Sequence, residues 1–459
     1  MHLKGLLLAL ATGLVILLLP IKWSIALLGA LTLTTVGLLH PVAIFPFLAV
    51  SIPLGSIREF SVGPAKVGLT ELMVLLLVIV WLARKSVLKE EWRSPGPFLF
   101  PFLILYGVMA FSTLQASSLE YSLKELLKWG EVLLVYLVVC TIVGRKEMPW
   151  VVGSLLLAGA IEGLLGVYQF LTGSGPEHFT VMGRFVRAYG HFMQPNPFGG
   201  YMGLVMPLAL ATSFGLVLDR SLSSGLACLI AAGVTGSALL MSWSRGAWLG
   251  AISALIVLAL LMDKRFALGL GLLILILGML IRPPLEWFLV RFQDLAFTPG
   301  LEDLRTAEVT DENYAVIERL AHWDAALRMW RDHFWLGVGI GNYEPVYRSY
   351  ALPRWPEPLG HAHNYYLNIA AETGFIGLLA YLFFWGWVFA QALKALSLHT
   401  GWEKALIIGT IGSLTHLAVH NFFDNLYVHG MYLHVGVLLG ILSLLGASIN
   451  ALPSLRGSP

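Results

Sequence analysis

The sequence predicts an all-α polytopic membrane protein with about 12 to 14 transmembrane helices and one large loop outside the membrane. Of its 459 residues, 57% are hydrophobic and only 12% are charged. The mean hydropathy is +0.77. Leu-rich runs, each able to cross a hydrocarbon core of roughly 30 Å, recur along nearly the whole chain. Because these runs are continuous and do not alternate with polar residues, they indicate helices.

The candidate spans follow one another with short connections. They are 5–20, 23–39, 41–57, 69–83, 98–114, 126–143, 149–171, 198–218, 224–241, 247–262, 266–281, 374–393, 403–420 and 431–449. Prolines interrupt the first three at Pro20, Pro41, Pro46 and Pro53. Because proline breaks helical hydrogen bonding, these three runs leave the number of spans between 12 and 14.

Lys and Arg collect in alternate short loops, which predicts that those loops are cytoplasmic. The basic residues concerned are Arg84, Lys85, Lys89, Arg93, Arg145, Lys146, Arg220, Lys264, Arg265, Lys394 and Lys404. The other loops are then external, at 115–124, 172–197, 242–246, 282–362 and 421–430. No small-residue cleavage site follows the first run before the next span, so we expect a retained helix there.

Three parts follow from this topology. Residues 1–281 are N-terminal transmembrane helices that carry arginine motifs, and residues 282–362 form an external loop. Residues 363–459 contain a histidine-bearing helix and the C-terminal transmembrane helices. The net charge of +2 comes with no basic patch, so no nucleic-acid partner is expected.

Cysteine and metal-binding patterns are sparse. Cys140 and Cys228 both lie in apolar spans, which predicts core residues without a disulfide. The sequence has no HExxH motif and no grouped cysteines, so it predicts no metal site. It has no Gly-x-Ser-x-Gly elbow, so it predicts no serine nucleophile. A carboxylate within a span is either functional or structural, and the structural role is pairing between helices or a position near a span end. The structural role is favoured for each of Glu71, Glu125, Glu131 and Glu162.

The first polar motif enters the span at 198–218. Pro195 and Pro197 bracket Asn196, which predicts an extended or turned backbone. Arg184 and Arg187 precede this break. Each is either an interfacial anchor or a ligand contact.

A second motif, Ser242–Ala247, joins two long apolar runs with almost no loop and places Arg245 at the external face. A charge at the bilayer centre costs roughly 2.5–3.5 kcal/mol on insertion scales, and less near the interface. An anchoring arginine would normally have a flexible flank, whereas this one sits in a tight Ser/Gly turn. The motif therefore favours an inward contact with an anion.

The external loop contains a predicted amphipathic helix. Its apolar stripe, spaced by three and four residues, consists of Val316, Leu320, Trp323, Leu327 and Trp330. Its polar face carries Glu318, Arg319, His322 and Arg328. The glycine-rich stretch from Gly337 to Tyr343 lacks the preceding strand and following lysine of a nucleotide site, which favours a tight turn back to the bundle.

His361 and His363 flank Ala362 just before a membrane-length apolar run. A helix that begins at His363 would place Asn364, Asn368 and Glu372 on one polar stripe. Two histidines beside such a stripe favour a functional role over a structural one. A second external polar cluster with a weaker claim consists of His420, Asn421, Asp424, Asn425 and His429.

These residue types suit one kind of chemistry. Guanidinium groups present parallel donors that match phosphate oxygens, at roughly 1.5–3 kcal/mol for each charge-assisted bond. A neutral histidine, with an ordinary pKa of about 6.5, can accept a proton from a hydroxyl at neutral pH. Together they would fit transfer from a lipid-linked diphosphate donor, with arginine in place of a metal to neutralise the leaving group.

The motifs also carry a resemblance. RxxG…PN (Arg187–Gly190, Pro195–Asn196), SRGA (Ser244–Ala247), a segment ending in GVGIGNY, and HxHNxYL…ExG…G (His361–Gly377) occur in this order. With this set, the chain resembles the O-antigen ligase and polymerase superfamily of bacterial inner-membrane proteins. The resemblance implies a helical bundle similar to the GT-C class of glycosyltransferases, an active site facing the periplasm, and no metal or other cofactor. It also implies undecaprenyl-diphosphate-linked glycans as donors.

The resemblance assigns roles to individual residues. His363 would deprotonate the acceptor hydroxyl, and Arg245 and Arg187 would grip the diphosphate while the anomeric carbon inverts. Substrate-binding roles are expected for Arg184, Arg319, His361, Asn364 and Asn196.

The acceptor remains open in the sequence. A ligase transfers to lipid A-core, a polymerase to another lipid-linked repeat, and a protein O-oligosaccharyltransferase to Ser or Thr. Ligation is favoured, because the HxHN and arginine motifs are best marked in ligases. A transporter or flippase would place functional polar groups on both membrane faces and show repeated halves, whereas here the polar motifs gather on the external side and no repeat is evident.

Overall fold

The computed structural model describes residues 20–55, 60–62, 65–87, 89–91, 93–181, 183–281, 304–310 and 313–446, together with residue 13. The N-terminal half contains the helices α2 (Ile21–Leu39), α3 (Phe45–Leu54), α4 (Leu69–Ser86), α5 (Leu99–Ser112), α6 (Leu119–Ile142), α7 (Met148–Thr172) and α8 (Pro195–Leu218). The C-terminal half contains α9 (Leu222–Met241), α10 (Arg245–Leu261), α11 (Lys264–Ile281), α13 (Tyr314–Asp332), α14 (Tyr343–Tyr347), α15 (Tyr365–Ala395), α16 (Gly401–His420) and α17 (Met431–Gly446). Short 3-10 turns join them at Pro41–Ile44, Thr113–Gln115, Glu177–Phe179, Gly190–Phe192 and Leu396–Leu398.

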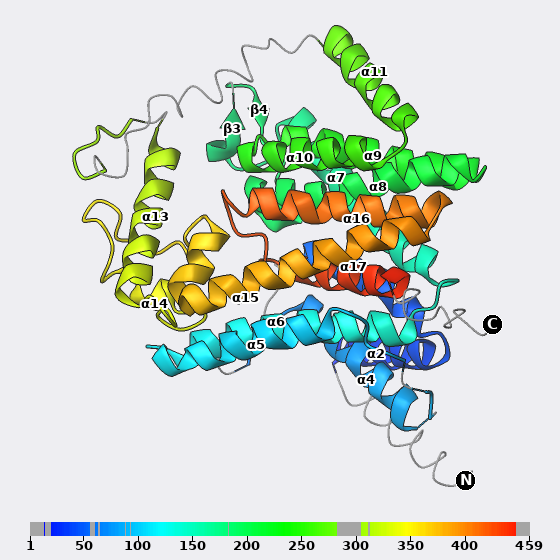
Figure 1. Cartoon of the computed structure of the whole chain (residues 1–459), viewed down its shortest axis with the longest axis horizontal. Helices are drawn as coiled ribbons and strands as arrows, with labels where there is room; N and C mark the ends of the chain where they lie inside the picture. The colour runs from blue at the N-terminus through cyan, green and yellow to red at the C-terminus, as the bar shows by residue number, and fades with distance from the viewer. Residues whose placement is uncertain are drawn as a thin grey trace, which may run out of the picture.

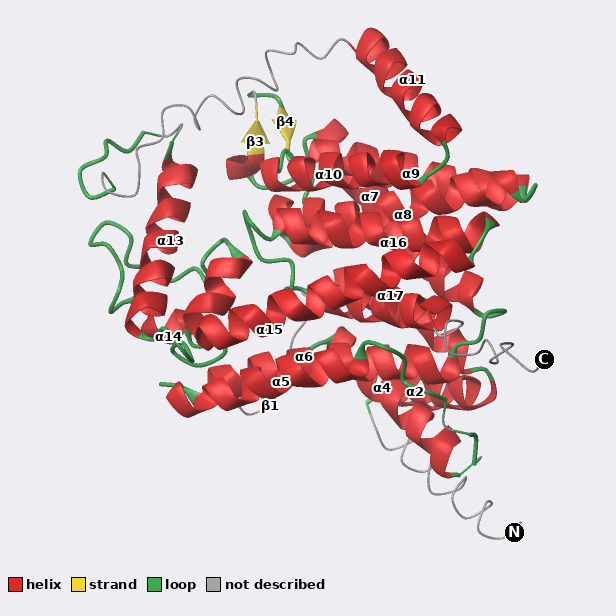
Figure 2. Ribbon diagram, viewed as in Figure 1, coloured by secondary structure: helices red, strands yellow, loops and turns green. Residues whose placement is uncertain are grey.

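The long helices lie roughly side by side in one bundle, and α13 and α14 cover one end of it (Figure 1). Strands are a minor component of the described residues (Figure 2). Two antiparallel hairpins pair β1 (Phe60–Val62) with β2 (Ala65–Val67) and β3 (Thr180–Val181) with β4 (Phe185–Val186). The predicted all-α class is therefore confirmed.

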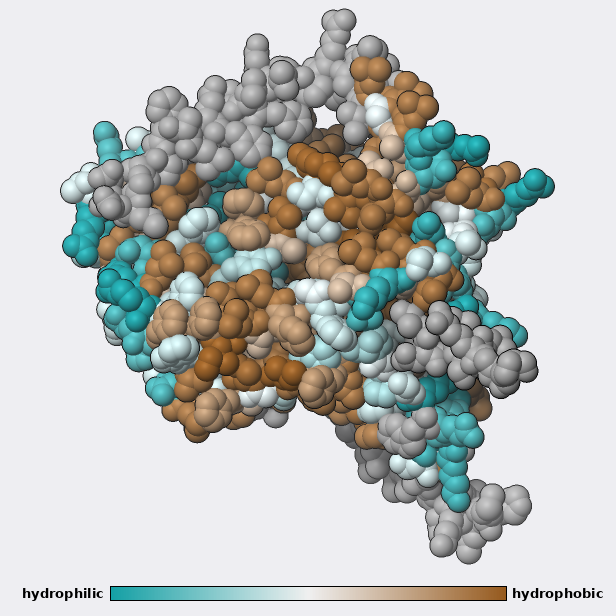
Figure 3. Space-filling view, in the orientation of Figure 1, coloured by the Kyte–Doolittle hydropathy of each residue, from teal (hydrophilic) through white to brown (hydrophobic). Residues whose placement is uncertain are grey.

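The surface of the bundle has the character of a membrane protein. Figure 3 shows a broad apolar zone across the middle of the molecule, with hydrophilic residues gathered towards its two ends. Large apolar side chains such as Phe100 and Trp150 are about three-quarters exposed, at 74% and 73%. Five described helices are long and apolar enough to cross a membrane: Ile21–Leu39, Met148–Thr172, Pro195–Leu218, Leu222–Met241 and Tyr365–Leu398. The chain is accordingly a polytopic membrane protein, as predicted.

The remaining expected spans are also helical. Each candidate span from 23–39 onward contains a helix of the bundle, although several of these helices are shorter than the runs that predicted them. The first candidate span, 5–20, lies almost wholly outside the described residues. The hydrophobic core runs through the bundle and includes Trp129, Tyr136, Tyr201 and Phe384.

One local expectation is wrong. The Pro195–Asn196–Pro197 stretch is the first turn of α8, with Gln194 as the preceding cap residue, and is not extended. The first N–H groups of a helix have no intrahelical partner, so proline loses nothing there, and its φ angle already suits a helix. The two prolines therefore begin this helix.

The predicted cytoplasmic loops meet at one end of the bundle. Arg145 lies 3.6 Å from the Glu403 carboxylate, and the Trp402 amide donates to Asp219 at 2.8 Å. These contacts join the start of α7, the start of α16 and the end of α8. The arginine and histidine motifs lie elsewhere, because their loops connect the opposite ends of the same helices.

The glycine-rich loop after α13 is a packing element, as predicted. Gly337, Gly339 and Gly341 all have positive φ angles, of 68°, 97° and 76°. A Cβ atom on any of them would approach another backbone segment within 2.3 to 2.7 Å, at Glu372, Ala116 and Tyr121 respectively. Glycine is therefore required for the loop to lie against α15 and α6.

The same loop interrupts α15. Gly374 has φ 68° and ψ −167°, and the Phe375 amide donates to the Phe334 carbonyl at 2.7 Å. The Val338 amide donates to the Ala371 carbonyl at 2.9 Å. The break in α15 is thus filled by hydrogen bonds from the loop, which fixes the external segment to the start of the helix that follows the histidines.

Candidate functional site

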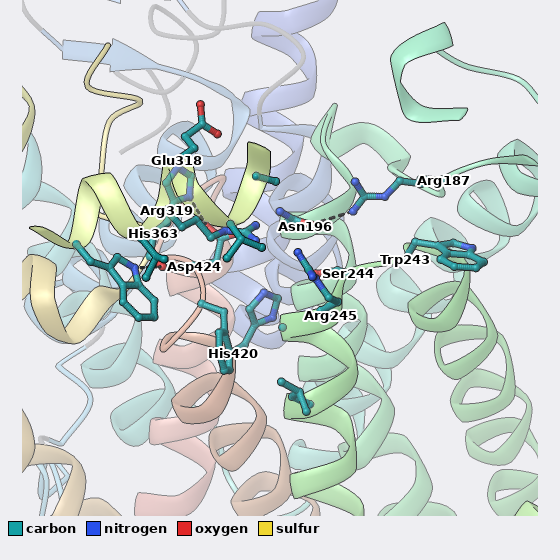
Figure 4. A pocket seen from close by; sticks show the side chains of 17 residues that line it. Arg187, Asn196, Trp243, Ser244, Arg245, Glu318, Arg319, His363, His420 and Asp424 are labelled. Atoms are coloured by element: carbon teal, nitrogen blue, oxygen red, sulfur yellow. Dashed lines mark hydrogen bonds and ion pairs between the residues drawn. The ribbon is translucent and has the colours of Figure 1, made fainter. Parts of the chain in front are cut away.

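A cavity of about 420 Å³ lies where the predicted external loops meet. Its lining comes from five separate parts of the chain: Arg187, Asn196, Trp243, Ser244, Arg245, Gly246, Leu249, Ala315, Val316, Glu318, Arg319, Leu320, Trp323, His363, His420, Phe423 and Asp424. Figure 4 shows the side chains of Arg319, Arg245 and Asn196 converging, with Arg187 beyond Asn196 and with His363 and Asp424 on the opposite side. We call this cavity the arginine–histidine pocket.

Arg187 is oriented by two hydrogen bonds. Its Nε atom donates to the Ser242 carbonyl at 2.9 Å, and its Nη2 atom donates to Oδ1 of Asn196 at 2.9 Å. Asn196 is in the first turn of α8, so the helix start holds the guanidinium. The Ala188 amide donates to the Met241 carbonyl at 2.9 Å, which joins the segment after β4 to the end of α9.

A buried carboxylate positions the segment just after Arg187. Glu162 of α7 is 2% exposed, and it accepts from the His191 amide at 2.6 Å and lies 2.8 Å from Nδ1 of His191. Gln169 accepts from the Gly190 amide at 2.8 Å. Gly190 has φ 54°, and a Cβ there would approach Glu162 within 1.9 Å. Glu162 is therefore paired with a loop residue, and not with another helix as the sequence predicted.

Arg245 is the first residue of α10, immediately after a sharp turn. Trp243 has φ 52°, and the Ser244 side chain caps the helix by accepting from the Ala247 amide at 3.4 Å. Ser and other small polar residues are favoured at this cap position because they bond an otherwise unpaired N–H. The turn directs Arg245 into the pocket, whereas Trp243 lies to one side of it (Figure 4).

The predicted amphipathic helix is present as α13, but its buried face differs from the predicted stripe. The fully buried positions are Ile317, Ala321, Ala325, Ala326 and Met329, each at 0% exposure. Alanines permit close approach to α15, whereas the larger residues of the predicted stripe lie partly exposed, some of them against the pocket. The spacing pattern identified the helix correctly and its contact face incorrectly.

His322, which was assigned to the polar face, is buried at 1% exposure. The Tyr343 hydroxyl donates to the His322 carbonyl at 3.2 Å, so Nδ1 of His322, at 2.9 Å, is the donor to that hydroxyl. Its ring stacks on Tyr347 at 4.6 Å and meets the His363 ring edge-on at 5.5 Å. Burial, together with the charge of His363, lowers the pKa of His322 to about 4. This histidine is therefore a neutral packing partner of His363.

His363 lies two residues before α15 and is not its first residue, because the helix begins at Tyr365. It has φ 50°, a left-handed conformation that is uncommon for residues other than glycine. The Trp323 indole donates to its carbonyl at 3.3 Å. Its Nδ1 atom lies 3.6 Å from Oδ1 of Asp424. The strained backbone thus turns the imidazole away from the helix and towards the pocket.

The polar stripe of α15 holds the loop before it. Asn364 caps the helix by accepting from the Leu367 amide at 3.1 Å, and Asn368 accepts from the Ala362 amide at 3.0 Å. Glu372 accepts from the Tyr343 amide at 3.1 Å. The stripe predicted from the sequence therefore fixes the histidine turn on one side and α14 on the other.

Both His361 and His363 face the Asp424 carboxylate. His361 Nε2 and His363 Nδ1 lie 3.7 Å and 3.6 Å from the same oxygen, Oδ1. Burial alone would raise the pKa of Asp424, but the contact with His363 and attraction to the surrounding histidines bring this pKa well below its usual value. Burial, with the charge of His363, lowers the pKa of His361 to about 3. At neutral pH the group is therefore a carboxylate beside a neutral His361.

The spacing of these three residues is compatible with a metal ion, since one donor atom from each lies within 4.8 Å of the others. The hydrogen bonds argue against it. His361 Nδ1 accepts from the His363 amide at 3.0 Å. A histidine that ligates through Nε2 carries its proton on Nδ1, where it would oppose that amide. The cluster as folded is arranged for hydrogen bonding to Asp424.

The structure separates the predicted site residues into two groups. Those that line the pocket are Arg187, Asn196, Arg245, Arg319 and His363. His361 lies behind His363 with its ring centroid 4.4 Å away. Asn364 is a helix cap, and Arg184 is exposed in the β3–β4 hairpin with its guanidinium 5.1 Å from the Phe185 ring. The placement of Arg184 and Asn364 gives no support to their expected substrate contacts.

Several lining residues were not among the predicted site residues. Asp424 and His420 belong to the external polar cluster that the sequence had marked, but nothing in the spacing linked that cluster to His363. Glu318 and Trp323 lie on α13, the helix that carries Arg319. A search of this helix for a second face that contacts the protein could have found Glu318 and Trp323.

The fold and pocket define a class: a polytopic α-helical membrane protein with a polar cavity at one end of its bundle, lined by arginines and a histidine–aspartate pair. Residues 226–382 match the family model described as O-antigen ligase. The match confirms the resemblance to the O-antigen ligase superfamily and supports a membrane glycosyltransferase of the ligase and polymerase type. No curated protein matches the chain. The matched residues contain Arg245, Arg319 and His363, whereas Arg187 and Asp424 lie outside them.

Proposed function

We propose that the protein transfers a glycan from undecaprenyl diphosphate to an acceptor hydroxyl at the periplasmic face of the bacterial inner membrane. The observation that supports this proposal is the arginine–histidine pocket, in which Arg187 and Arg245 lie across from the His363–Asp424 pair (Figure 4). A diphosphate and a hydroxyl nucleophile need these two environments next to each other. The reaction favoured is ligation of O-antigen to lipid A-core.

In the proposed step His363 is the general base. Asp424 faces Nδ1, so the acceptor O–H gives its proton to Nε2. The acceptor oxygen then bonds to the anomeric carbon from the side opposite the diphosphate. The bond between that carbon and the phosphate oxygen breaks, its electron pair stays on the diphosphate, and the configuration inverts. The Nδ1 to Oδ1 distance of 3.6 Å is longer than a hydrogen bond, and such contacts tighten when substrate binds.

The arginines would stabilise the departing diphosphate. Arg187 is pre-oriented by Asn196 and Ser242, and Arg245 is pre-oriented by the capped turn of α10. Pre-oriented donors need little rearrangement while negative charge develops, which is why they favour the transition state. Arg319, from α13, completes a set contributed by three different segments. No metal is needed in this scheme, because the guanidinium groups supply the positive charge.

The acceptor distinguishes ligation from two alternatives with the same chemistry: polymerisation of a lipid-linked repeat and O-glycosylation of a protein. The test uses purified protein in liposomes with undecaprenyl-diphosphate glycan and each acceptor in turn. Glycosylated lipid A-core is the expected product. A lengthened lipid-linked glycan with no lipid A-core product would replace ligation by polymerisation, and a glycosylated Ser or Thr peptide would replace it by protein glycosylation.

A transporter or flippase is the alternative from another class. Such a protein would need its polar residues to continue from one membrane face to the other. The residues that line the pocket come from loops and helix ends on one side of the bundle. Accumulation of intact donor inside sealed liposomes, without any transfer product, would favour the transporter.

A further inference from the structure

We propose that His361 is a positioning residue that sets the proton arrangement of His363, and that it does not contact the substrate. This inference rests on the proposed role of His363 as the base. His361 lies outside the pocket lining, yet its ring meets that of His363 at a centroid distance of 4.4 Å and an interplanar angle of 64°.

One hydrogen bond fixes which nitrogen of His361 carries a proton. The backbone amide of His363 donates to Nδ1 of His361 at 3.0 Å. A neutral imidazole has one donor nitrogen and one acceptor nitrogen, so an accepting Nδ1 places the proton on Nε2. That Nε2–H faces Oδ1 of Asp424 at 3.7 Å. His361 therefore directs a ring N–H towards the carboxylate and restrains the left-handed backbone of His363 at the same time.

The second consequence concerns the carboxylate. Oδ1 of Asp424 faces both Nε2 of His361 and Nδ1 of His363. Two donors that share one oxygen each receive less of its negative charge than a single donor would. His361 thereby limits how strongly Asp424 interacts with the Nδ1 side of the His363 ring.

The surroundings restrain the same turn. Asn368 accepts from the Ala362 amide at 3.0 Å, and the Tyr365 amide donates to the Asn421 carbonyl at 2.7 Å. Other titratable groups near the pair are His322 from α13, edge-on to His363 at 5.5 Å, and His420 at the end of α16, which acts on Asp424 through its charge. The charge of Lys128, from α6, also acts on His361. Within the described part of the chain, the His363 amide bonds to His361, which also faces the Asp424 carboxylate.

Two substitutions separate the two contacts. In His361→Asn the amide oxygen takes the place of Nδ1, so the acceptor for the His363 amide is kept and the donor to Asp424 is lost. In His361→Gln the side-chain amide can reach the place of Nε2, so the donor is kept and the acceptor is lost. We expect His361→Asn to shift the acidic limb of the kcat/KM profile to higher pH by about half to one unit, because Asp424 then pairs with His363 alone. We expect His361→Gln to lower kcat about 10- to 100-fold without that shift and with KM for the donor unchanged.

A second measurement does not depend on activity. In the full-length protein labelled with ¹⁵N-histidine and held in lipid nanodiscs, the nitrogen chemical shifts report which ring nitrogen is protonated. The signal that disappears in His361→Asn is expected to belong to an Nε2–H imidazole. An Nδ1–H signal there, or two variants with the pH profile and kcat of the native protein, would overturn the proposal. If the native protein gives the expected nitrogen signals but transfers no glycan, the proposed function fails and the proton arrangement stands. The matched control for folding is Arg331→Gln, at an exposed position of α13.

Discussion

His363 and Asp424 meet through Nδ1 and Oδ1 at 3.6 Å, although one residue precedes α15 and the other follows α16. The contact brings together two loops, both predicted to be external, that are separated in the chain by α15 and α16. Asp424 is buried at 6% exposure, and burial of a carboxylate is unfavourable unless it is paired. The neighbouring histidines provide that pairing, and the pair in turn leaves Nε2 as the nitrogen available for a substrate proton.

Substitutions of His363 and of Asp424 should both impair transfer, but to different degrees. We expect His363→Ala to abolish transfer, because no other base lies at the same position, and Asp424→Asn to lower kcat by about 10² or more, since the amide can hold the wrong imidazole tautomer. The measurement is initial rate with lipid-linked donor in liposomes. Size-exclusion profiles of both variants should match that of the native protein, and undiminished transfer by His363→Ala would refute the base assignment.

The two neighbouring arginines of the 183–190 stretch should differ sharply. Arg187 lines the pocket with two hydrogen bonds that orient it, whereas Arg184 is exposed on the β3–β4 hairpin. We expect Arg187→Gln to lower kcat/KM by about 10- to 100-fold, the loss of one or two charge-assisted bonds. Arg184→Gln is expected to remain within about twofold of the native protein, because exposed charges contribute little. Equal losses in both variants would contradict the placement of Arg187.

A charge-preserving change tests the fork of Arg245. Lys keeps the positive charge but replaces two parallel donors by a compact ammonium on a flexible stem. We therefore expect Arg245→Lys to lower kcat/KM for the diphosphate donor about tenfold, and Arg245→Gln to lower it further. Identical kinetics for the lysine variant and the native protein would mean that Arg245 supplies charge alone.

Much of the fold could be predicted because lipid exposure imposes a simple rule. Every backbone polar group in a span must be bonded within a helix, so long apolar runs such as 149–171 and 224–241 correspond closely to α7 and α9. The rule fails at the ends of helices. Pro195 reads as a helix breaker but begins α8, because its missing N–H falls where no hydrogen bond would form.

The site was predictable to the extent that polar residues next to membrane spans require a cause. That reasoning singled out Arg245 and His363 but left Arg184 and Arg187 undecided, and the resemblance then selected Arg187. Arg187, Arg245 and His363 all line one cavity. It could not pair His363 with Asp424, since periodicity carries no information about which distant loops meet. It also placed His322 on a polar face, because small alanines, which carry little weight in a hydrophobic stripe, are among the most buried residues of α13.

The break in α15 can be tested without any substrate. Gly374 has φ 68°, and a Cβ there would lie 2.3 Å from the Trp335 carbonyl carbon, so Gly374→Ala combines a left-handed alanine with a backbone clash. We expect it to destabilise the protein by about 2–4 kcal/mol and to lower the thermal midpoint followed by tryptophan fluorescence in detergent. Gly386 of the same helix has nothing within 4 Å of an added Cβ, so Gly386→Ala should leave the midpoint unchanged or raise it slightly, in line with the gain of about 0.5–1 kcal/mol for Ala over Gly in a helix. Equal midpoints for the two variants would mean that the external segment does not depend on the glycine break to seat against α15.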